Sequence, residues 1–257
     1  MKKIVAFTYT ILATLLLSAQ GYYVEFKMSS ASKEAALNGT MKTFSQDGNS
    51  RSEINMVVPQ LPGGGMKITS LTLKAEPSKI YLINEKDKTY SEMETGSQED
   101  YKDLPQADYE ITVVGKETVN GYNTTHAIIK INGKLREELW TTKDIAGYAD
   151  FSKIKTKYTG KDNMFKALGA KGADGMPVRI KAEDRGQGMQ MDLVKAEKRE
   201  NPSAMFTLNG YTKGSAFSGI PGGEGMQEMM KKLQNMTPQE REEMLKHMQD
   251  LYSKQPH

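Results

Sequence analysis

Cysteine is absent from this chain of 257 residues, which also holds only one tryptophan and three histidines. Without cysteine the protein can form no disulfide bond, no thiolate metal site and no cysteine nucleophile. The same absence excludes a lipid anchor on an N-terminal cysteine. The fold must therefore be stabilised by its hydrophobic core.

The few histidines leave little scope for hydrolytic chemistry. A serine–histidine–carboxylate site would have to use His126, yet no G-x-S-x-G sequence occurs, and we interpret His126 as a partly buried strand residue. No pair of acidic residues stands out as glycosidase carboxylates, and no histidine spacing is typical of zinc. The glycine-rich stretches at 62–65 and 221–225 lack the Gly-Lys-Ser/Thr of a phosphate-binding loop. We expect neither an enzyme nor a cofactor.

Opposite charges nearly balance, because 35 Lys and Arg stand against 32 Asp and Glu, a net charge of +3. Nucleic acid or an anionic membrane surface would favour a concentrated basic face, so neither is expected as the main partner. The apolar run Ile4–Leu17 is shorter than the about 20 residues that a membrane-spanning helix needs. We therefore do not expect an integral membrane protein.

The first residues have the order typical of a signal peptide. Lys2 and Lys3 precede the apolar run, and small residues follow it at Ser18 and Ala19. We expect residues 1–19 to be removed by cleavage near Ala19. The mature protein would then be soluble, and periplasmic or secreted.

Alternating apolar and polar residues predict many short strands. Tyr22, Val24, Phe26 and Met28 recur at every second position, as in a strand with one buried face. A turn is expected at Asp47-Gly48. The other candidate strands are 52–58, 67–75, 79–84, 89–93, 176–182 and 189–193.

Two Asn-Gly pairs give the clearest local prediction. Asn120-Gly121 and Asn132-Gly133 separate the β-rich runs 109–119, 122–131 and 134–142. Both central residues of a tight hairpin turn need positive φ, which Asn and Gly adopt readily. The pattern predicts a three-stranded antiparallel meander.

Helical spacing occurs in one insertion between strands. Phe151, Ile154 and Tyr158 share a face within residues 148–168, where Gly160 is expected to separate two short helices. This insertion is placed to cover a face of the sheet.

The C-terminal part has a different pattern. A Gly-rich linker at 214–225 precedes residues 226–257, which are predicted to form a Met-rich helical hairpin. With the signal peptide at 1–19, this leaves residues 20–213 as the β domain.

Methionine is unusually frequent, at 17 residues. In the tail, Met244, His247 and Met248 share a helical face, and such soft ligands suit Cu(I). Helical spacing alone also explains these positions, as an apolar face that docks on the β domain, a lipid or a partner. A Cu(I) site and an interaction module for another envelope protein are therefore alternatives to the function expected below.

Four segments resemble a known family: DGNSR at 47–51, PSKIYLIN with KTYSEM at 77–93, GKETVNGY through ELWTT at 115–142, and PSAMF with GY at 202–211. Over roughly residues 22–213, the sequence is similar to the exported domain-of-unknown-function family 4412. More distantly, it resembles the LolA and LolB group of carriers and receptors of bacterial lipoproteins.

The resemblance implies a mainly β (α+β) fold: a strongly curved antiparallel sheet, or unclosed barrel, with a covering helical insertion and a C-terminal helical hairpin. Its concave side would enclose an apolar space suited to acyl chains. We therefore expect an exported, non-enzymatic carrier or binding protein for a lipid or other apolar ligand. The candidate contacts are Met56, Val58, Leu71, Leu73, Ile80 and Leu82 on the sheet, Phe151, Ile154 and Tyr158 on a helical lid, and Trp140, an aromatic either at an exposed rim or packed beneath a loop.

Overall fold

The computed structural model describes residues 21–30, 38–57, 65–94, 109–131, 133–145, 162–184 and 187–215. They form twelve strands, the α-helix α3 (Asp162–Ala170) and the 3-10 helix η1 (Ser203–Phe206). The strands are β1 (Tyr22–Ser30), β2 (Asn38–Gln46), β3 (Asn49–Val57), β4 (Gly65–Leu73), β5 (Glu76–Asn84), β6 (Thr89–Glu94), β7 (Tyr109–Val119), β8 (Tyr122–Ile131), β9 (Lys134–Thr142), β10 (Met176–Asp184), β11 (Gln187–Lys198) and β12 (Thr212–Lys213).

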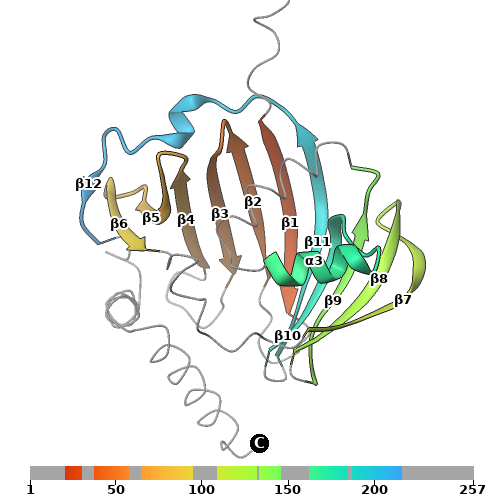
Figure 1. Ribbon diagram of the computed structural model, residues 1–257. Coiled ribbons are helices and arrows are strands. Elements are labelled where there is room, and N and C mark those ends of the chain that lie inside the picture. Colours follow the sequence, from red (N-terminus) through yellow and green to blue (C-terminus); the bar gives the residue numbers. More distant parts are fainter. Residues whose placement is uncertain are drawn as a thin grey trace, which may run out of the picture.

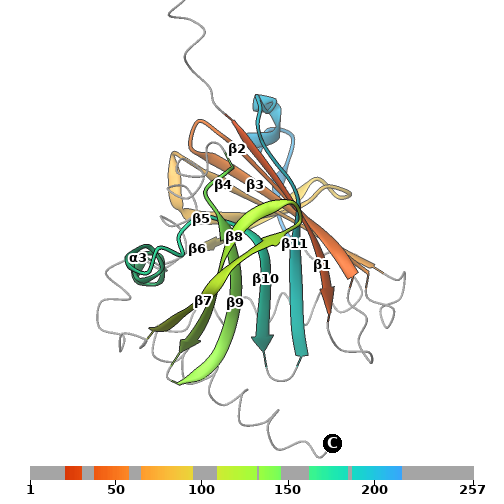
Figure 2. The ribbon, with the colours of Figure 1, turned by 90° about the vertical axis from the view of Figure 1, so that its right-hand side faces the viewer.

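All twelve strands belong to one open sheet, in the order β12-β6-β5-β4-β3-β2-β1-β11-β10-β9-β8-β7 (Figure 1). Neighbouring strands are antiparallel except β12, which runs parallel to β6. Figure 2 shows that β6 and β7 curve toward the side occupied by α3, while β1 and β11 lie farthest from it. The predicted mainly β fold with a curved, unclosed sheet is therefore confirmed, and α3 lies on its concave side.

The tight turns follow the predicted chemistry. Asp47 and Gly48 join β2 to β3 with φ of 53° and 85°, and Asn120 and Gly121 join β7 to β8 with 50° and 82°. Positive φ at both central residues matches the right-handed twist of the flanking strands. The meander at 109–142 is confirmed, with the three strand ranges as predicted.

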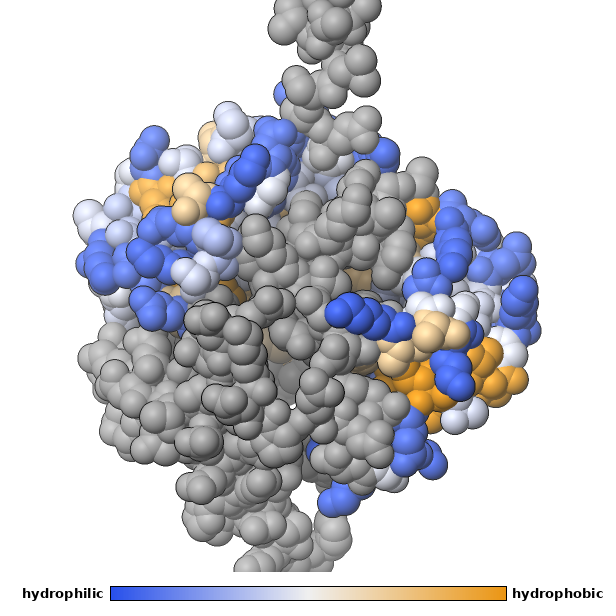
Figure 3. Space-filling view, viewed as in Figure 1, coloured by the Kyte–Doolittle hydropathy of each residue, from blue (hydrophilic) through white to orange (hydrophobic). Residues whose placement is uncertain are grey.

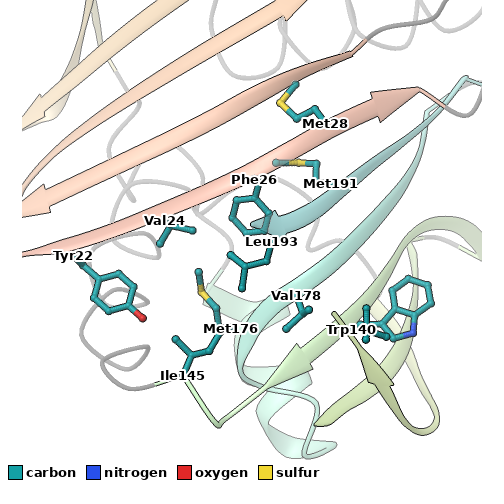
Figure 4. Close-up of a cluster of buried hydrophobic side chains, with 11 residues drawn as sticks. Tyr22, Val24, Phe26, Met28, Trp140, Ile145, Met176, Val178, Met191 and Leu193 are labelled. Carbon is teal, nitrogen blue, oxygen red and sulfur yellow. The ribbon is translucent and has the colours of Figure 1, made fainter. Parts of the chain in front are cut away.

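The main core lies where β1, β10 and β11 meet. Tyr22, Val24, Phe26 and Met28 of β1 are at most 5% exposed, as predicted, but Tyr23 on the opposite face is also buried, at 5%, so the start of β1 is covered on both sides. Figure 4 shows these side chains beside those of β10 and β11, with Trp140 at the edge of the cluster on the side of Val178. Their partners in this cluster include Ile145, Met176, Val178, Met191 and Leu193.

Helix α3 covers the meander end of the concave side. Its buried residues Met164 and Leu168 pack with Ala127, Ile129 and Leu139. Short β-sheets are rarely stable with both faces in water, so this cover stabilises β7–β9. The predicted helical insertion falls partly on α3, and its residues 148–161, like the C-terminal hairpin, are outside the described residues.

The segment after β11 crosses the convex side of the sheet to its far edge (Figure 1). Buried Asn201 ties it to β1 and β2: its Nδ2 donates to the carbonyls of Tyr22 at 3.2 Å and Ser45 at 2.9 Å. Phe206 of η1 then packs on Tyr23 and Phe44 in a second core cluster. The segment ends as β12, pairing with β6.

The sequence pattern did not predict β2. Its apolar residues, Met41 and Phe44, are three positions apart and lie on opposite faces, so β2 shows no two-residue period.

Candidate ligand-binding face

Cross-strand register determines which side chains share the concave face. Met28 lies opposite Met191, which lies opposite Ile180, and Ile180 lies opposite Leu139 beneath α3. Directly opposed residues point to the same side of a sheet. Met28 therefore faces the concave side, together with every residue in register with it across β2–β6.

Apolar residues occupy one end of this concave face on β2–β4. Two cross-strand rows, Gly39–Met56–Met66 and Met41–Ile54–Ile68, continue the rows of Met28 and Phe26. Each of these side chains is half-buried, in contrast to the fully buried core at β1. The apolar residues of these rows are Met41, Ile54, Met56, Met66 and Ile68, whereas Leu82, Ile80 and Met93 of β5 and β6 lie toward the other end of the face, where Leu82 is in register with Ser70.

Hydroxyl groups occupy the other end of the same face. Thr43, Ser52 and Ser70 form a row that continues Val24, and Ser45, Ser50 and Thr72 lie along the next row. The hydroxyls of Thr43 and Ser52 are 3.2 Å apart, within hydrogen-bonding distance. We call these six residues the hydroxyl band.

Every charged residue of β2–β6 lies on the convex face. The register places Lys42 opposite Glu53, Lys67 opposite Asn55, and Lys79 opposite Glu94, all on that face. The remaining charged residues there are Arg51, Glu76 and Glu92. The concave face of these five strands therefore carries no formal charge.

The convex charges are used in local pairs. Buried Arg51 donates from Nε to Glu53 Oε1 at 2.9 Å, from Nη1 to the Met205 carbonyl at 3.5 Å, and pairs with Glu85. Burial alone would raise the pKa of Glu85, but Lys67 and Arg51 together hold it below its ordinary value. Of these contacts, the bond from Arg51 to the Met205 carbonyl joins the crossing segment to the sheet.

His126 and Trp140 belong to a polar cluster on the convex side of the meander. The two rings stack with centroids 4.1 Å apart and an interplanar angle of 11°. His126 Nε2 lies 3.1 Å from Glu138 Oε2, and Arg179 Nε donates to Asp192 Oδ1 at 2.7 Å. Burial alone would raise the pKa of Asp192, but its bonds from Gln190 and Arg179 lower it. In the described ranges, no three His, Cys, Asp or Glu side chains gather as metal ligands.

The structure divides the predicted contact residues between two faces. Met56, Ile80 and Leu82 all face the concave side of β2–β6, Met56 near one end and Ile80 and Leu82 toward the other. Leu71 and Leu73 face the convex side, where they pack in the cluster with Phe206. Trp140 is 5% exposed and packed among its neighbours, and Val58, Phe151, Ile154 and Tyr158 lie outside the described residues.

The sequence interpretation missed Met41, Met66 and Ile68, which the register brings beside Met56 and Ile54, and Met93, which lies opposite Ile80. The sequence pattern that marks these residues is weak, because each of the strands β2, β4 and β6 contributes only one or two of them. The hydroxyl band was also missed. Serine and threonine in a strand become informative only when neighbouring strands place them in one row.

A further apolar area lies at the meander end. Figure 3 shows apolar side chains gathered there beside α3. Val113 and Leu135 are each 39% exposed, and Val113 lies opposite Ala127 on the concave side.

No helix in the described parts of the chain is long and apolar enough to cross a membrane.

Solved structures of similar shape have low sequence identity to this chain. An uncharacterized conserved protein from Thermus thermophilus is 10% identical with a TM-score of 0.43, over 80% of this chain and 99% of that one. LprF from Mycobacterium bovis is 12% identical with a TM-score of 0.32, over 68% and 85%. A putative outer membrane lipoprotein-sorting protein domain from Vibrio parahaemolyticus is 11% identical with a TM-score of 0.25, over 74% and 90%.

No curated protein matches the sequence. A family model does, over residues 22–210, and this range includes all the strands except β12. The chain belongs to the DUF4412 family, a domain of unknown function.

Proposed function

We propose that this protein is an exported, non-enzymatic carrier or binding protein that holds a lipid or another apolar ligand against the concave face of β2–β6. The observation that supports this is the segregation of charge on these strands. Apolar side chains line the concave face at half exposure, while every charged residue faces the other way. A partly buried apolar face without charge is suited to binding an apolar ligand.

Burial of hydrocarbon supplies the binding energy in this mechanism. Each CH₂ removed from water contributes about 0.8 kcal/mol, so a long acyl chain can be held without any ionic contact. Phe151, Ile154 and Tyr158 would close over the ligand as the inner face of a lid. Binding needs no reactive group, which agrees with the scarcity of histidine and the absence of cysteine.

Native mass spectrometry of protein purified from its own cell envelope tests the proposal. We expect a co-purifying lipid, and displacement of a fluorescent acyl probe by that lipid. Met56→Glu places a charge on the concave face and should weaken probe binding at least about 10-fold, since the buried charge has no partner. Asn55→Glu is the matched control, because Asn55 is the adjacent exposed residue on the convex face. The proposal is wrong if no lipid co-purifies and acyl probes with neutral and charged head groups all fail to bind.

The Cu(I) and interaction alternatives depend on the tail, which lies outside the described residues. Cu(I) titration of the full chain tests the first: affinity unchanged by Met244→Leu with Met248→Leu would remove it. Loss of a partner on deletion of residues 226–257 would support the second.

A further inference from the structure

The hydroxyl band lies directly beside the apolar rows of the concave face. Ser70 follows Ile68 by two residues on β4, and Ser52 precedes Ile54 by two on β3. Residues two apart in a strand lie on the same face, about 7 Å from one another. On β2–β4 the face is therefore amphipathic along the strand direction: hydrocarbon-lined at one end and hydroxyl-lined at the other, with Leu82 of β5 beside Ser70.

Hydroxyl groups are suited to an uncharged polar ligand group. Each serine or threonine hydroxyl offers one donor and two acceptor sites, and so can bond to an ester carbonyl or to a ligand hydroxyl. Thr43, Ser52 and Ser70 are half-buried and lie side by side across three strands. One ligand head group can therefore contact several of them together.

At Ser52 and Ser70, a carboxylate or phosphate would meet no cation from the described strands β2–β6. The register turns Lys42, Arg51, Lys67 and Lys79 to the convex side. Lys198 of β11 is on the concave face, in the row of Tyr22 and Ser45, and is two strands away from Ser45 and three from Ser52. At about 4.8 Å per strand, Ser52 is at least about 14 Å from Lys198, too far for a direct ion pair with a head group held at Ser52 and Ser70. An anionic head group would lose its hydration without compensation.

We infer that the ligand is an acyl lipid with an uncharged, hydrogen-bonding head group, of the monoacylglycerol or acyl-ester class. The acyl chain lies on the rows of Met56 and Ile54, and the head group bonds to the hydroxyl band at Ser52 and Ser70. This inference rests on the proposed function, because it specifies which lipid the same face accepts.

Three ligands that share the same oleoyl chain test the inference with the full-length protein. They are monooleoylglycerol, oleate and oleoyl lysophosphatidic acid. At a pH where both acids are ionised, we expect monooleoylglycerol to bind at least about 10-fold more tightly than either anion. Ser52→Ala with Ser70→Ala should weaken monooleoylglycerol about 5-fold or more, and leave binding of an alkane probe unchanged. Thr40→Val, on the convex face of β2, is the control and should change neither.

A charge-gain variant tests the same point in the opposite direction. Ser70→Lys supplies the missing cation and should raise oleate affinity relative to monooleoylglycerol at least about 10-fold, whereas Thr40→Lys on the convex face should not. Equal or tighter binding of the anions to the unmodified protein would overturn the inference while leaving the proposed function in place. Failure of all three ligands and of the alkane probe would overturn both.

Discussion

The indole Nε1 of Trp140 donates a hydrogen bond to Glu117 Oε1 at 2.5 Å, although Glu117 lies on β7 and Trp140 on β9. The bond crosses β8, where His126 stacks on the indole. Trp140 is thereby held at 5% exposure on the convex side of the meander. The only tryptophan of the chain is a packing residue and a fluorescent reporter of this cluster.

Replacement of Glu117 should destabilise the meander. Glu117→Ala removes the acceptor of a buried N–H, and we expect the free energy of unfolding to fall by about 1–3 kcal/mol. Urea unfolding followed by Trp140 emission measures this. Glu110→Ala, at an exposed position of the same strand, should change stability by less than about 0.5 kcal/mol. Equal stability of the two variants would contradict the role of this bond.

Two adjacent tyrosines should make the protein sensitive to strong alkali. Burial, with a smaller contribution from Tyr122, raises the pKa of Tyr22 to about 12. Burial and then the bond that Tyr23 donates to Glu25 at 2.5 Å raise the pKa of Tyr23 to about 12. An unfolded chain ionises tyrosine near pH 10.

Because the folded pKa values lie above the unfolded value, the neutral tyrosines stabilise the fold fully below about pH 10. That stability is lost as the pH rises from about 10 to about 12. Ultraviolet absorbance of tyrosinate should show a late-ionising fraction in the folded protein that Tyr22→Phe and Tyr23→Phe each reduce. Complete tyrosine ionisation near pH 10 in the folded state would contradict this prediction.

Glycine at position 21 is required by close packing. A Cβ there would lie 2.1 Å from Gln46 Oε1 and 2.4 Å from the Arg199 carbonyl oxygen, where the crossing segment begins. Gly21→Ala should therefore lower the free energy of unfolding by about 1–3 kcal/mol, as in other overpacked sites. Gly169→Ala in α3 is the matched control, because nothing lies within 4 Å of its Cβ position. In thermal unfolding the control should be unchanged or slightly more stable, since alanine favours helix.

Local chemistry made part of this fold predictable. The period of Tyr22 to Met28 and the turn at Asn120-Gly121 depend on nearby residues, so sequence alone was sufficient. β2 depends on its neighbours instead: Met41 is matched with Phe26 and Ile54, and Phe44 with Tyr23 and Arg51, on opposite faces. Such a strand has no pattern of its own.

The sequence predicted that the candidate site is an apolar sheet face, but it did not predict which residues line that face. β4 is apolar on both sides, with Ile68 facing the concave side and Leu71 the convex side. Hydropathy alone therefore could not separate the residues that line the ligand face from those that pack beneath η1. The uncharged character of the face becomes evident only when register aligns the five strands.

The pairing of β12 with β6 has a consequence for self-association. Thr212 N donates to the Lys88 carbonyl at 2.9 Å, and Gly214 N to the Tyr90 carbonyl at 2.9 Å, so β6 no longer offers these groups to another molecule. Among the described strands, β7 is the long one left at the sheet boundary. Joining two copies β7 to β7 would cover the long open strand of each copy in one two-fold contact, which closes on itself as a dimer.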